Sequence, residues 1–337
     1  MRLNLYDKDL NRIRFIDENF ISCLWAENYN SSGKFTIELP LTEENKKNVK
    51  PDTYVGRWDR KTIMVIKSVT ADGERIIATG STADRQLEDV AFIGTINENS
   101  TAVAALKTAY DSCEKYPHIE IEASSLPDRY KSQISNKSVR ELLETICQGA
   151  DIGYRAEKDG NEIKIRFYKP ESNENLKFSR EYGNLQDFSL YSSTEAEKNH
   201  AIILGSGKGD DRAKAEIDLR TDTSIQKRSV IIDARDMSLE EGETQDSYKQ
   251  RLIERGVQKL LEYQKIHEVK FTPRYTLGVD FELGDILTAL LNDYNIKIRA
   301  RVTGFTQKQQ NNQTTTTIEL GEKQTLTSAT THTSGTA

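Results

Sequence analysis

The sequence has 337 residues, which at roughly 150 residues per domain predicts about two domains. Hydrophobic residues make up 36% and charged residues 30%, so the chain can form buried cores beneath a solvated surface. Lysine and arginine number 47 against 53 aspartates and glutamates, a formal charge of −6. That balance argues against a basic nucleic-acid-binding surface over the whole chain.

Apolar runs are short, as at residues 201–204, whereas a membrane-spanning helix needs about 20 apolar residues. We therefore expect no stable membrane insertion. The N-terminus lacks the apolar stretch of a secretory signal and resembles a strand instead. Cys23, Cys113 and Cys147 are far apart and odd in number, which disfavours a disulfide framework and predicts folding in a reducing cytoplasm.

Residues 1–94 are predicted to form an N-terminal β domain. Apolar and polar residues alternate at 34–39 before a proline, which is typical of a strand with one buried face. Asp72 and Gly73 separate two apolar segments and predict a tight hairpin with positive φ angles.

Residues 95–170 predict a small inserted α/β module. Ser138 and Glu141 have the spacing of a helix capping box, and Gly149 lies where the C-cap of that helix is expected. Alternating apolar residues on both sides of Asp159-Gly160 then predict a hairpin.

Residues 171–324 predict a second β region that contains one long helix, at 245–267, and ends in a β-meander. Gly256 lies in the middle of this helix, where it either allows close approach of another backbone or is a tolerated weak position. The Thr- and Ser-rich residues 325–337 predict a flexible tail. The predicted fold class is α+β and mainly β.

Two segments have the composition of a ligand site. The glycine-rich segment 205–211 lacks the spacing of a phosphate-binding loop or a dinucleotide fingerprint, so we interpret it as a surface turn. An acidic cluster precedes the long helix without EF-hand spacing, so we interpret it as a charged loop at the helix N-terminus. The cluster consists of Asp233, Asp236, Glu240, Glu241 and Glu243.

No candidate catalytic set emerges from the remaining polar residues. Cys113 and Cys147 lie on apolar helix stripes and predict core positions, and His267 is interpreted as a helix-end residue. We therefore expect no catalytic, cofactor-binding or metal-binding residue, no cofactor and no enzymatic activity. The histidines, none at metal-ligand spacing from a cysteine or another histidine, are His118, His200, His267 and His332.

The order of predicted elements resembles that of the phage tail hub family. This family includes baseplate hubs, the N-terminal regions of tail-associated lysins and Gp37-like siphovirus tail proteins. Three stretches carry the resemblance: a strand with small residues, glycine and an aromatic at 29–40, the segment at 79–90, and a leucine-glycine-aspartate turn within 275–287.

The resemblance implies two β-barrel-like tail-tube-type domains and a homotrimer that joins the tail tube to a central spike or tip. It implies a location at the tail tip of a virion or bacteriocin-like particle, assembled in the host cytoplasm. The implied partners are the tail tube, distal tail proteins, the spike or tip protein, the tape-measure protein and DNA in transit.

Two other functions remain as alternatives. The first is a carbohydrate- or receptor-binding β-rich module of the tail, with Trp25 and Trp58 as the aromatic candidates. Trp25 lies in a strand-like apolar stretch, which favours a core position for it. The second is a tail-associated cell-wall hydrolase, for which the sequence contains no recognisable motif.

Overall fold

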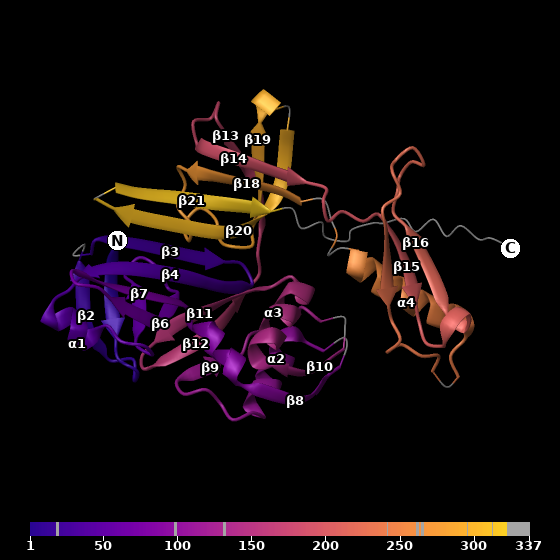
Figure 1. Cartoon of the computed structure of the whole chain (residues 1–337), viewed down its shortest axis with the longest axis horizontal. Coiled ribbons are helices and arrows are strands. Elements are labelled where there is room, and N and C mark those ends of the chain that lie inside the picture. Colours follow the sequence, from indigo (N-terminus) through magenta and orange to yellow (C-terminus); the bar gives the residue numbers. More distant parts are fainter. Residues whose placement is uncertain are drawn as a thin grey trace. The chain divides into compact units, whose positions relative to one another are not determined.

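The structure is a computed structural model, and its described residues form two compact units. Unit 1 contains Met1–Ser189 and Lys270–Leu320, and unit 2 contains Leu190–Val269 and Gly321 (Figure 1). The boundaries expected at residues 94 and 170 remain predictions, and the expected tail lies outside the described residues. The structure describes residues 1–321 apart from 18–19, 98–99, 131–132, 241, 261–262, 264–265, 295 and 312.

Strands from both ends of the chain form one main sheet, which confirms the predicted mainly β class. β3 (Ser22–Asn28) pairs antiparallel with β20 (Ile296–Gln310). β19 (Ile286–Leu291) pairs with β20 and, in parallel, with β13 (Ser172–Ser179). The remaining order is β14 (Leu185–Ser193), β18 (Ile266–Pro273) and β21 (Gln313–Gly321) on the β20 side, and β4 (Ser31–Pro40), β7 (Arg75–Thr82), β6 (Ile63–Ala71), β5 (Tyr54–Arg57), β1 (Arg2–Tyr6) and β2 (Arg12–Asp17) on the β3 side.

The expected pair of barrel-like domains is corrected by this topology. Across the described ranges no sheet closes into a barrel, because the outer strands β14 and β2 do not pair with each other. Apolar alternation identifies a strand, but it does not say which strand lies beside it. Pairing of β3 with β20 joins residues more than 250 positions apart, which local pattern cannot reveal.

The hairpin predicted at Asp72 and Gly73 joins β6 and β7, but its mechanism differs from the prediction. Neither residue has a positive φ angle. Instead, Asp72 Oδ1 accepts hydrogen bonds from the backbone N–H groups of Glu74 and Arg75, at 3.1 and 3.0 Å. An aspartate side chain that binds its own backbone in this way stabilises a turn without glycine geometry.

The α/β module packs two helices side by side against short strands (Figure 1). The Ser138–Glu141 capping box is present as predicted. The helix ends one residue beyond the expected cap: Gly149 is helical, and Asp151 takes the left-handed conformation instead. The elements are β8 (Ala91–Ile96), α2 (Ala102–Asp111), β9 (Ile119–Ile121), β10 (Ile134–Ser138), α3 (Val139–Ala150), β11 (Gly153–Asp159) and β12 (Glu162–Tyr168).

One continuous hydrophobic core connects this module to the first β region. Tyr54 of β5, together with Ile63 and Val65 of β6, belongs to the same buried cluster as Leu142 and Ile146 of α3. The module therefore shares its core with strands before residue 94 within unit 1. Short helices complete the described chain: α1 (Glu43–Asn48) and 3-10 helices at Ala83–Asp89, Gly209–Asp211 and Asn292–Tyr294.

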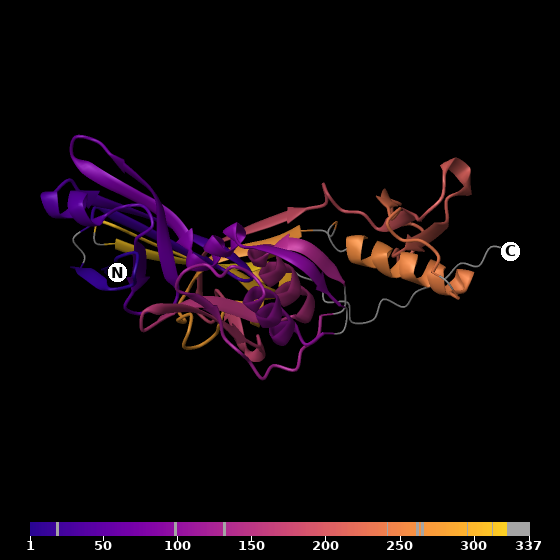
Figure 2. The same cartoon turned by 90° about the horizontal axis from the view of Figure 1, so that it is seen from below.

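Unit 2 is a three-stranded sheet covered on one face by α4 (Gln245–Leu260), as Figure 2 shows from below. The strand order is β16 (Lys214–Asp218), β15 (His200–Leu204) and β17 (Ser229–Asp233). Gly256 allows α4 to lie close to this sheet, because a Cβ there would be 2.6 Å from the Cδ1 atoms of Ile203 and Ile217.

The long helix is shorter than predicted. It ends at Leu260, and β18 begins at Ile266. Val269 and Phe271 of this strand are both fully buried, and the strand already begins at Ile266, inside the range predicted to be helical. His267 consequently lies in a strand, and its side chain is outside the described part of the structure.

Replacing Leu260 with Ala should lower the free energy of unfolding by roughly 2–5 kcal/mol, because the side chain is fully buried in the core of unit 2. Gln250→Ala, on the exposed part of the same helix, is the matched control. Chemical denaturation monitored by circular dichroism would measure both variants. Equal midpoints for the two variants would contradict the assigned buried face. The equivalent test at Leu261 lies outside the described residues.

Replacing Gly80 with Ala should destabilise unit 1 by roughly 1–3 kcal/mol, because a Cβ would lie 1.9 Å from the carbonyl oxygen of Val65 and 2.6 Å from the Phe35 ring. Gly73→Ala is the control, since no atom lies within 4 Å of a Cβ at that position. Thermal unfolding should show a lower Tm for the first variant alone. A Gly80 variant as stable as the control would refute this close approach.

Candidate functional site

A buried ion pair lies where the main sheet meets the module. Glu27 of β3 is only 2% exposed. Arg60, just after β5, donates from Nε and Nη2 to the two oxygens of this carboxylate, each at 2.9 Å. Thr62 Oγ1 and Trp25 Nε1 donate to the same carboxylate at 2.7 and 2.9 Å. Four donors thus satisfy a charge that burial would otherwise make very unfavourable.

The electrostatics of Glu27 follow from these neighbours. Burial acts to raise the pKa of its carboxyl, but the Arg60 guanidinium and the hydrogen bonds from Arg60, Thr62 and Trp25 lower it to about 2. The same carboxylate raises the pKa of Arg60 against the opposing effect of burial. Both groups are therefore charged throughout the physiological range.

Two further segments are connected to this ion pair, one directly and one through its neighbours. Arg60 Nη1 donates to the carbonyl oxygen of Leu277 at 3.0 Å. Thr62 forms an isolated antiparallel bridge with Glu157 of β11. Arg155 of β11 pairs with Glu282 at 2.7 Å. These contacts join β3, the β5–β6 connection, the module hairpin and the 277–285 turn, which we call the Glu27 junction.

The leucine-glycine-aspartate turn highlighted in the sequence forms one side of the Glu27 junction. Gly278 and Gly284 have φ angles of +85° and +93°, which other residues rarely adopt. The Asp285 carboxylate accepts from the backbone N–H groups of Glu171 and Glu282, each at 2.8 Å. The turn is therefore held by its own side chain and glycines, in a position that brings Leu277 to Arg60.

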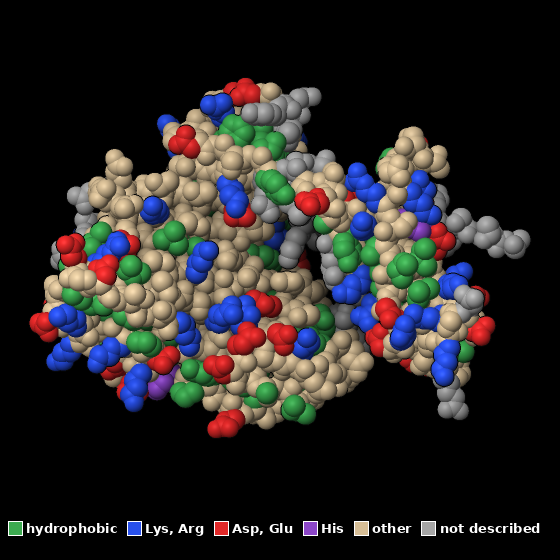
Figure 3. Space-filling model, viewed as in Figure 1, with side chains coloured by type: hydrophobic (Ala, Val, Ile, Leu, Met, Phe, Trp, Pro, Cys, Tyr) green, Lys and Arg blue, Asp and Glu red, His purple; other side chains and the backbone are tan. Residues whose placement is uncertain are grey.

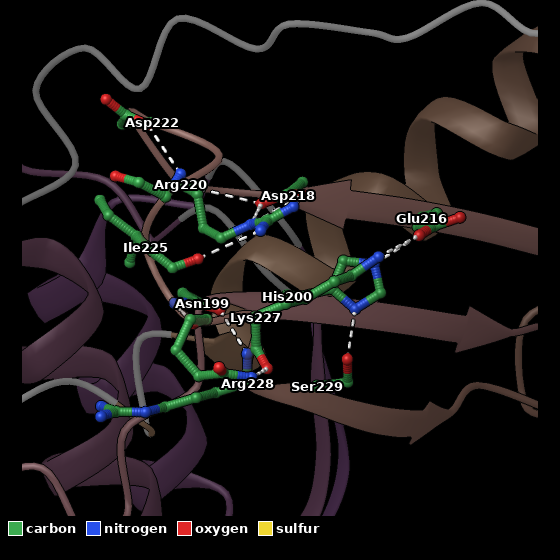
Figure 4. A network of polar contacts seen from close by, with 12 residues as sticks. Asn199, His200, Glu216, Asp218, Arg220, Asp222, Ile225, Lys227, Arg228 and Ser229 are labelled. Atoms are coloured by element: carbon green, nitrogen blue, oxygen red, sulfur yellow. Dashed lines mark hydrogen bonds and ion pairs between the residues drawn. The ribbon is translucent and has the colours of Figure 1, made fainter.

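Unit 2 contains a second polar network, shown in Figure 4. His200 Nδ1 lies 2.9 Å from Ser229 Oγ, and its Nε2 contacts Glu216 Oε1 (Figure 4). Lys227 also pairs with Glu216, at 3.2 Å. These residues belong to or flank the three strands of the sheet. The hydrogen bond from His200 and the one from Lys227 lower the pKa of Glu216.

Ser229, His200 and Glu216 are the residue types of a catalytic triad, in which serine is the nucleophile, histidine the base and glutamate the acid. The burial of His200 indicates a structural role instead. The His200 side chain is only 1% exposed, so a substrate has no access to the imidazole. The three residues instead connect β17, β15 and β16. Sequence reasoning missed this role, since His200 was examined only for metal-ligand spacing and its partners come from two other strands.

The acidic cluster before α4 forms ion pairs with arginines. Arg251 pairs with Glu243 at 2.7 Å and with Glu240 at 3.2 Å. Hydrogen bonds from Arg251 lower the pKa of Glu243 to about 2. Thr244 Oγ1, rather than a carboxylate, accepts the Ser247 N–H at the helix start. The remaining acids are Asp233, paired with Arg212, Asp236, paired with Arg255, and Glu241, which lies outside the described residues.

The other highlighted residues do not come together as a site. Residues 205–211 form the turn between β15 and β16. Cys147 is fully buried, and burial raises the pKa of its thiol. Cys113 is half-buried and packs against the same core. Trp25 is fully buried, whereas Trp58 is 64% exposed. Among the described residues, no group of three metal-ligating side chains gathers and no helix is suited to cross a bilayer.

Comparison with known proteins identifies the family. The model of the Siphovirus ReqiPepy6 Gp37-like protein family matches residues 117–322, which is more than half of the chain. The chain belongs to this family. A comparison of the Gp37-like chain with curated proteins gives no significant match.

Solved structures resemble the Gp37-like chain along nearly its whole length. Prophage tail protein gp18 from Listeria monocytogenes EGD-e has a TM-score of 0.61 at 14% identity, with 96% of each chain covered. The tail protein from Neisseria meningitidis MC58 has a TM-score of 0.63 at 13% identity, covering 95% of this chain and 96% of that one. The prophage MuSo2 43 kDa tail protein from Shewanella oneidensis has a TM-score of 0.61 at 12% identity, covering 95% and 98%. The fold is therefore that of these tail proteins.

Replacing Glu27 with Gln should lower the free energy of unfolding by roughly 3–5 kcal/mol, because Arg60 would remain buried without its counter-charge. The wild-type contribution is present above the unfolded pKa of about 4.5 and is lost as pH falls toward the folded value of about 2. Urea denaturation across this range should therefore show a smaller acid-induced loss in the variant.

Glu74→Gln, at an exposed position in the β6–β7 turn, serves as the control for this substitution. It should behave as wild type at both ends of the pH range. A Glu27 variant with wild-type stability and wild-type pH dependence would show that the buried ion pair does not hold the junction together.

Proposed function

We propose that this chain is a structural tail protein, a hub at the tail tip that joins the tail tube to a central spike or tip. The observation that carries the proposal is the whole-length fold similarity to three tail proteins, two of them from prophages, with at least 95% of both chains covered in each case. Membership of the Gp37-like siphovirus family supports the same assignment. The role is mechanical, and we assign no catalytic residue to it.

We propose that the hub is a homotrimer with the tail tube, distal tail proteins, the spike or tip protein and the tape-measure protein as neighbours. A hub that ends a tail requires a closed symmetric ring, because an open head-to-tail contact would polymerise. One relative of similar fold, with a TM-score of 0.54, belongs to the Francisella PdpA–VgrG complex, of whose chain 53% is covered. This supports a role within a larger assembly.

DNA would pass through the ring without being retained. A basic channel would bind the phosphate backbone and stall passage, so we expect a neutral or acidic lumen. The formal charge of −6 is consistent with this expectation. On the face shown in Figure 3, acidic and basic side chains lie interspersed over each unit, without one large area of single charge.

Copy number in intact particles tests the proposal. Mass measurement of isolated tail tips should find three copies of this chain per tail, with a tail-tube subunit quantified in the same sample as the internal standard. Six copies per tail would contradict the trimeric hub. A lumen lined mainly by Lys and Arg, seen by electron cryomicroscopy of the same particles, would contradict the proposed passage of DNA.

A further inference from the structure

Strands β1 and β2 contain buried residues and residues that are only partly covered, whereas all four residues of the neighbouring β5 are buried. Asn4 of β1 pairs with Gly56 of β5 on one side and with Phe15 of β2 on the other, so these three residues share a face. Phe15 is 46% exposed, and Trp58, beyond the end of β5, is 64% exposed. Two large aromatic side chains are thus accessible in this part of unit 1.

A cleft of about 400 Å³ adjoins this surface. Tyr6 and Gly56 line it from the sheet, and Lys158 lines it from the module hairpin. The bridge between Thr62 and Glu157 connects the two sides, which makes the cleft a preformed feature rather than a gap between separate bodies. It lies directly beside the Glu27 junction, since Arg60 also lines it.

The charges that line the cleft are unequal. Five cationic side chains and one carboxylate contribute to its walls. The three arginines already have carboxylate partners, among them Asp59 for Arg57 and Glu27 for Arg60. Lys61 and Lys158 have no carboxylate partner within the described chain. The Lys158 ammonium donates to the carbonyl oxygen of Gly160 and lies 4.8 Å from the Tyr6 ring centre. Both lysines therefore keep a positive charge that no carboxylate neutralises.

We propose, on the basis of the tail role proposed above, that the cleft and the aromatic surface beside it dock an acidic peptide segment of another tail protein. We call the two together the Trp58 cleft and define it by Tyr6, Lys61 and Lys158 of the cleft lining and by Phe15 and Trp58 of the neighbouring surface. Carboxylates of the segment pair with Lys61 and Lys158. An aliphatic side chain beside them covers Trp58 and Phe15. Trp58 remains largely accessible although the Arg2 guanidinium lies 5.6 Å from its ring centre. An accessible tryptophan on a surface with lysines that lack a carboxylate partner is the composition of an interface centre, and complementary charge sets the orientation of the partner.

The charge pattern favours a peptide over nucleic acid. A DNA backbone needs cations repeated along a track, because each phosphate carries a charge. The Trp58 cleft offers two lysines without a carboxylate partner, Glu157 also lines it, and Asp59 pairs with the lining residue Arg57. One or two carboxylates on a short segment match this arrangement, whereas a continuous row of phosphates would meet repulsion.

Titration of the full chain with a defined peptide tests the proposal. The probe is acetyl-Gly-Asp-Leu-Asp-Leu-Gly-amide, followed through the two tryptophan indole N–H resonances in nitrogen–proton correlation spectra. We expect the Trp58 resonance to shift with saturation while that of Trp25, buried and bonded to Glu27, stays in place. Binding should weaken with added salt. The same peptide with Asn in place of Asp should not bind.

Charge reversal at the two lysines separates docking from general attraction. Lys61→Glu with Lys158→Glu should weaken binding about tenfold or more, whereas Lys47→Glu with Lys50→Glu, at exposed positions elsewhere in unit 1, should change it little. Unchanged circular dichroism and Tm in both double variants ensure that folding is not the cause.

Two outcomes would overturn the proposal. One is the absence of any Trp58 shift, or a shift that survives the Lys61 and Lys158 reversal. The other is a short mixed-sequence DNA duplex that shifts Trp58 at lower concentration than the peptide, which would make the cleft a nucleic-acid site. Either result leaves the trimeric hub untouched, because that function is measured by copy number.

Discussion

The structure of unit 1 depends on burying one carboxylate and one guanidinium together. Glu27 and Arg60 are each less than a tenth exposed, and burying either charge without the other would strongly destabilise the fold. The pair does not have to stabilise the fold more than a hydrophobic pair would. The ion pair fixes the positions of the segments that carry it, because a bidentate pair with two further donors allows one geometry. The remaining nitrogen of Arg60 then holds Leu277 through its carbonyl oxygen.

This position matters because the segments it joins are far apart in the chain. β3 lies in the first tenth of the sequence, β11 in the middle and the 277–285 turn near the end. The ladder between β3 and β20 and the shared core of β5, β6 and α3 join the same regions by apolar and backbone contacts. Unit 2 has its own core and is inserted between β14 and β18, which are neighbours in the main sheet. The chain can thus carry a separate body without interrupting the order of that sheet.

Local features of this fold were predictable from the residues, and non-local ones were not. The Ser138–Glu141 capping box and the turn at Gly160, with φ of +60°, depend on a few neighbouring positions, and both are present. The end of α4 was misplaced because helical and strand patterns overlap after Leu260. The prediction of closed barrels was wrong, and the partners of Glu27 and His200 were not predicted. Sheet closure and these side-chain contacts depend on residues that only the complete fold brings together.

The central claim is that the first β region, the module and the C-terminal meander form one cooperative body around Glu27. Native-state hydrogen exchange of the full chain in rising denaturant measures this directly. The account predicts that the slowest-exchanging amides of β3, β11 and β20 converge on a single opening free energy. Exchange of β11 and α3 through a separate, lower-energy opening, while β3 and β20 stay protected, would contradict it.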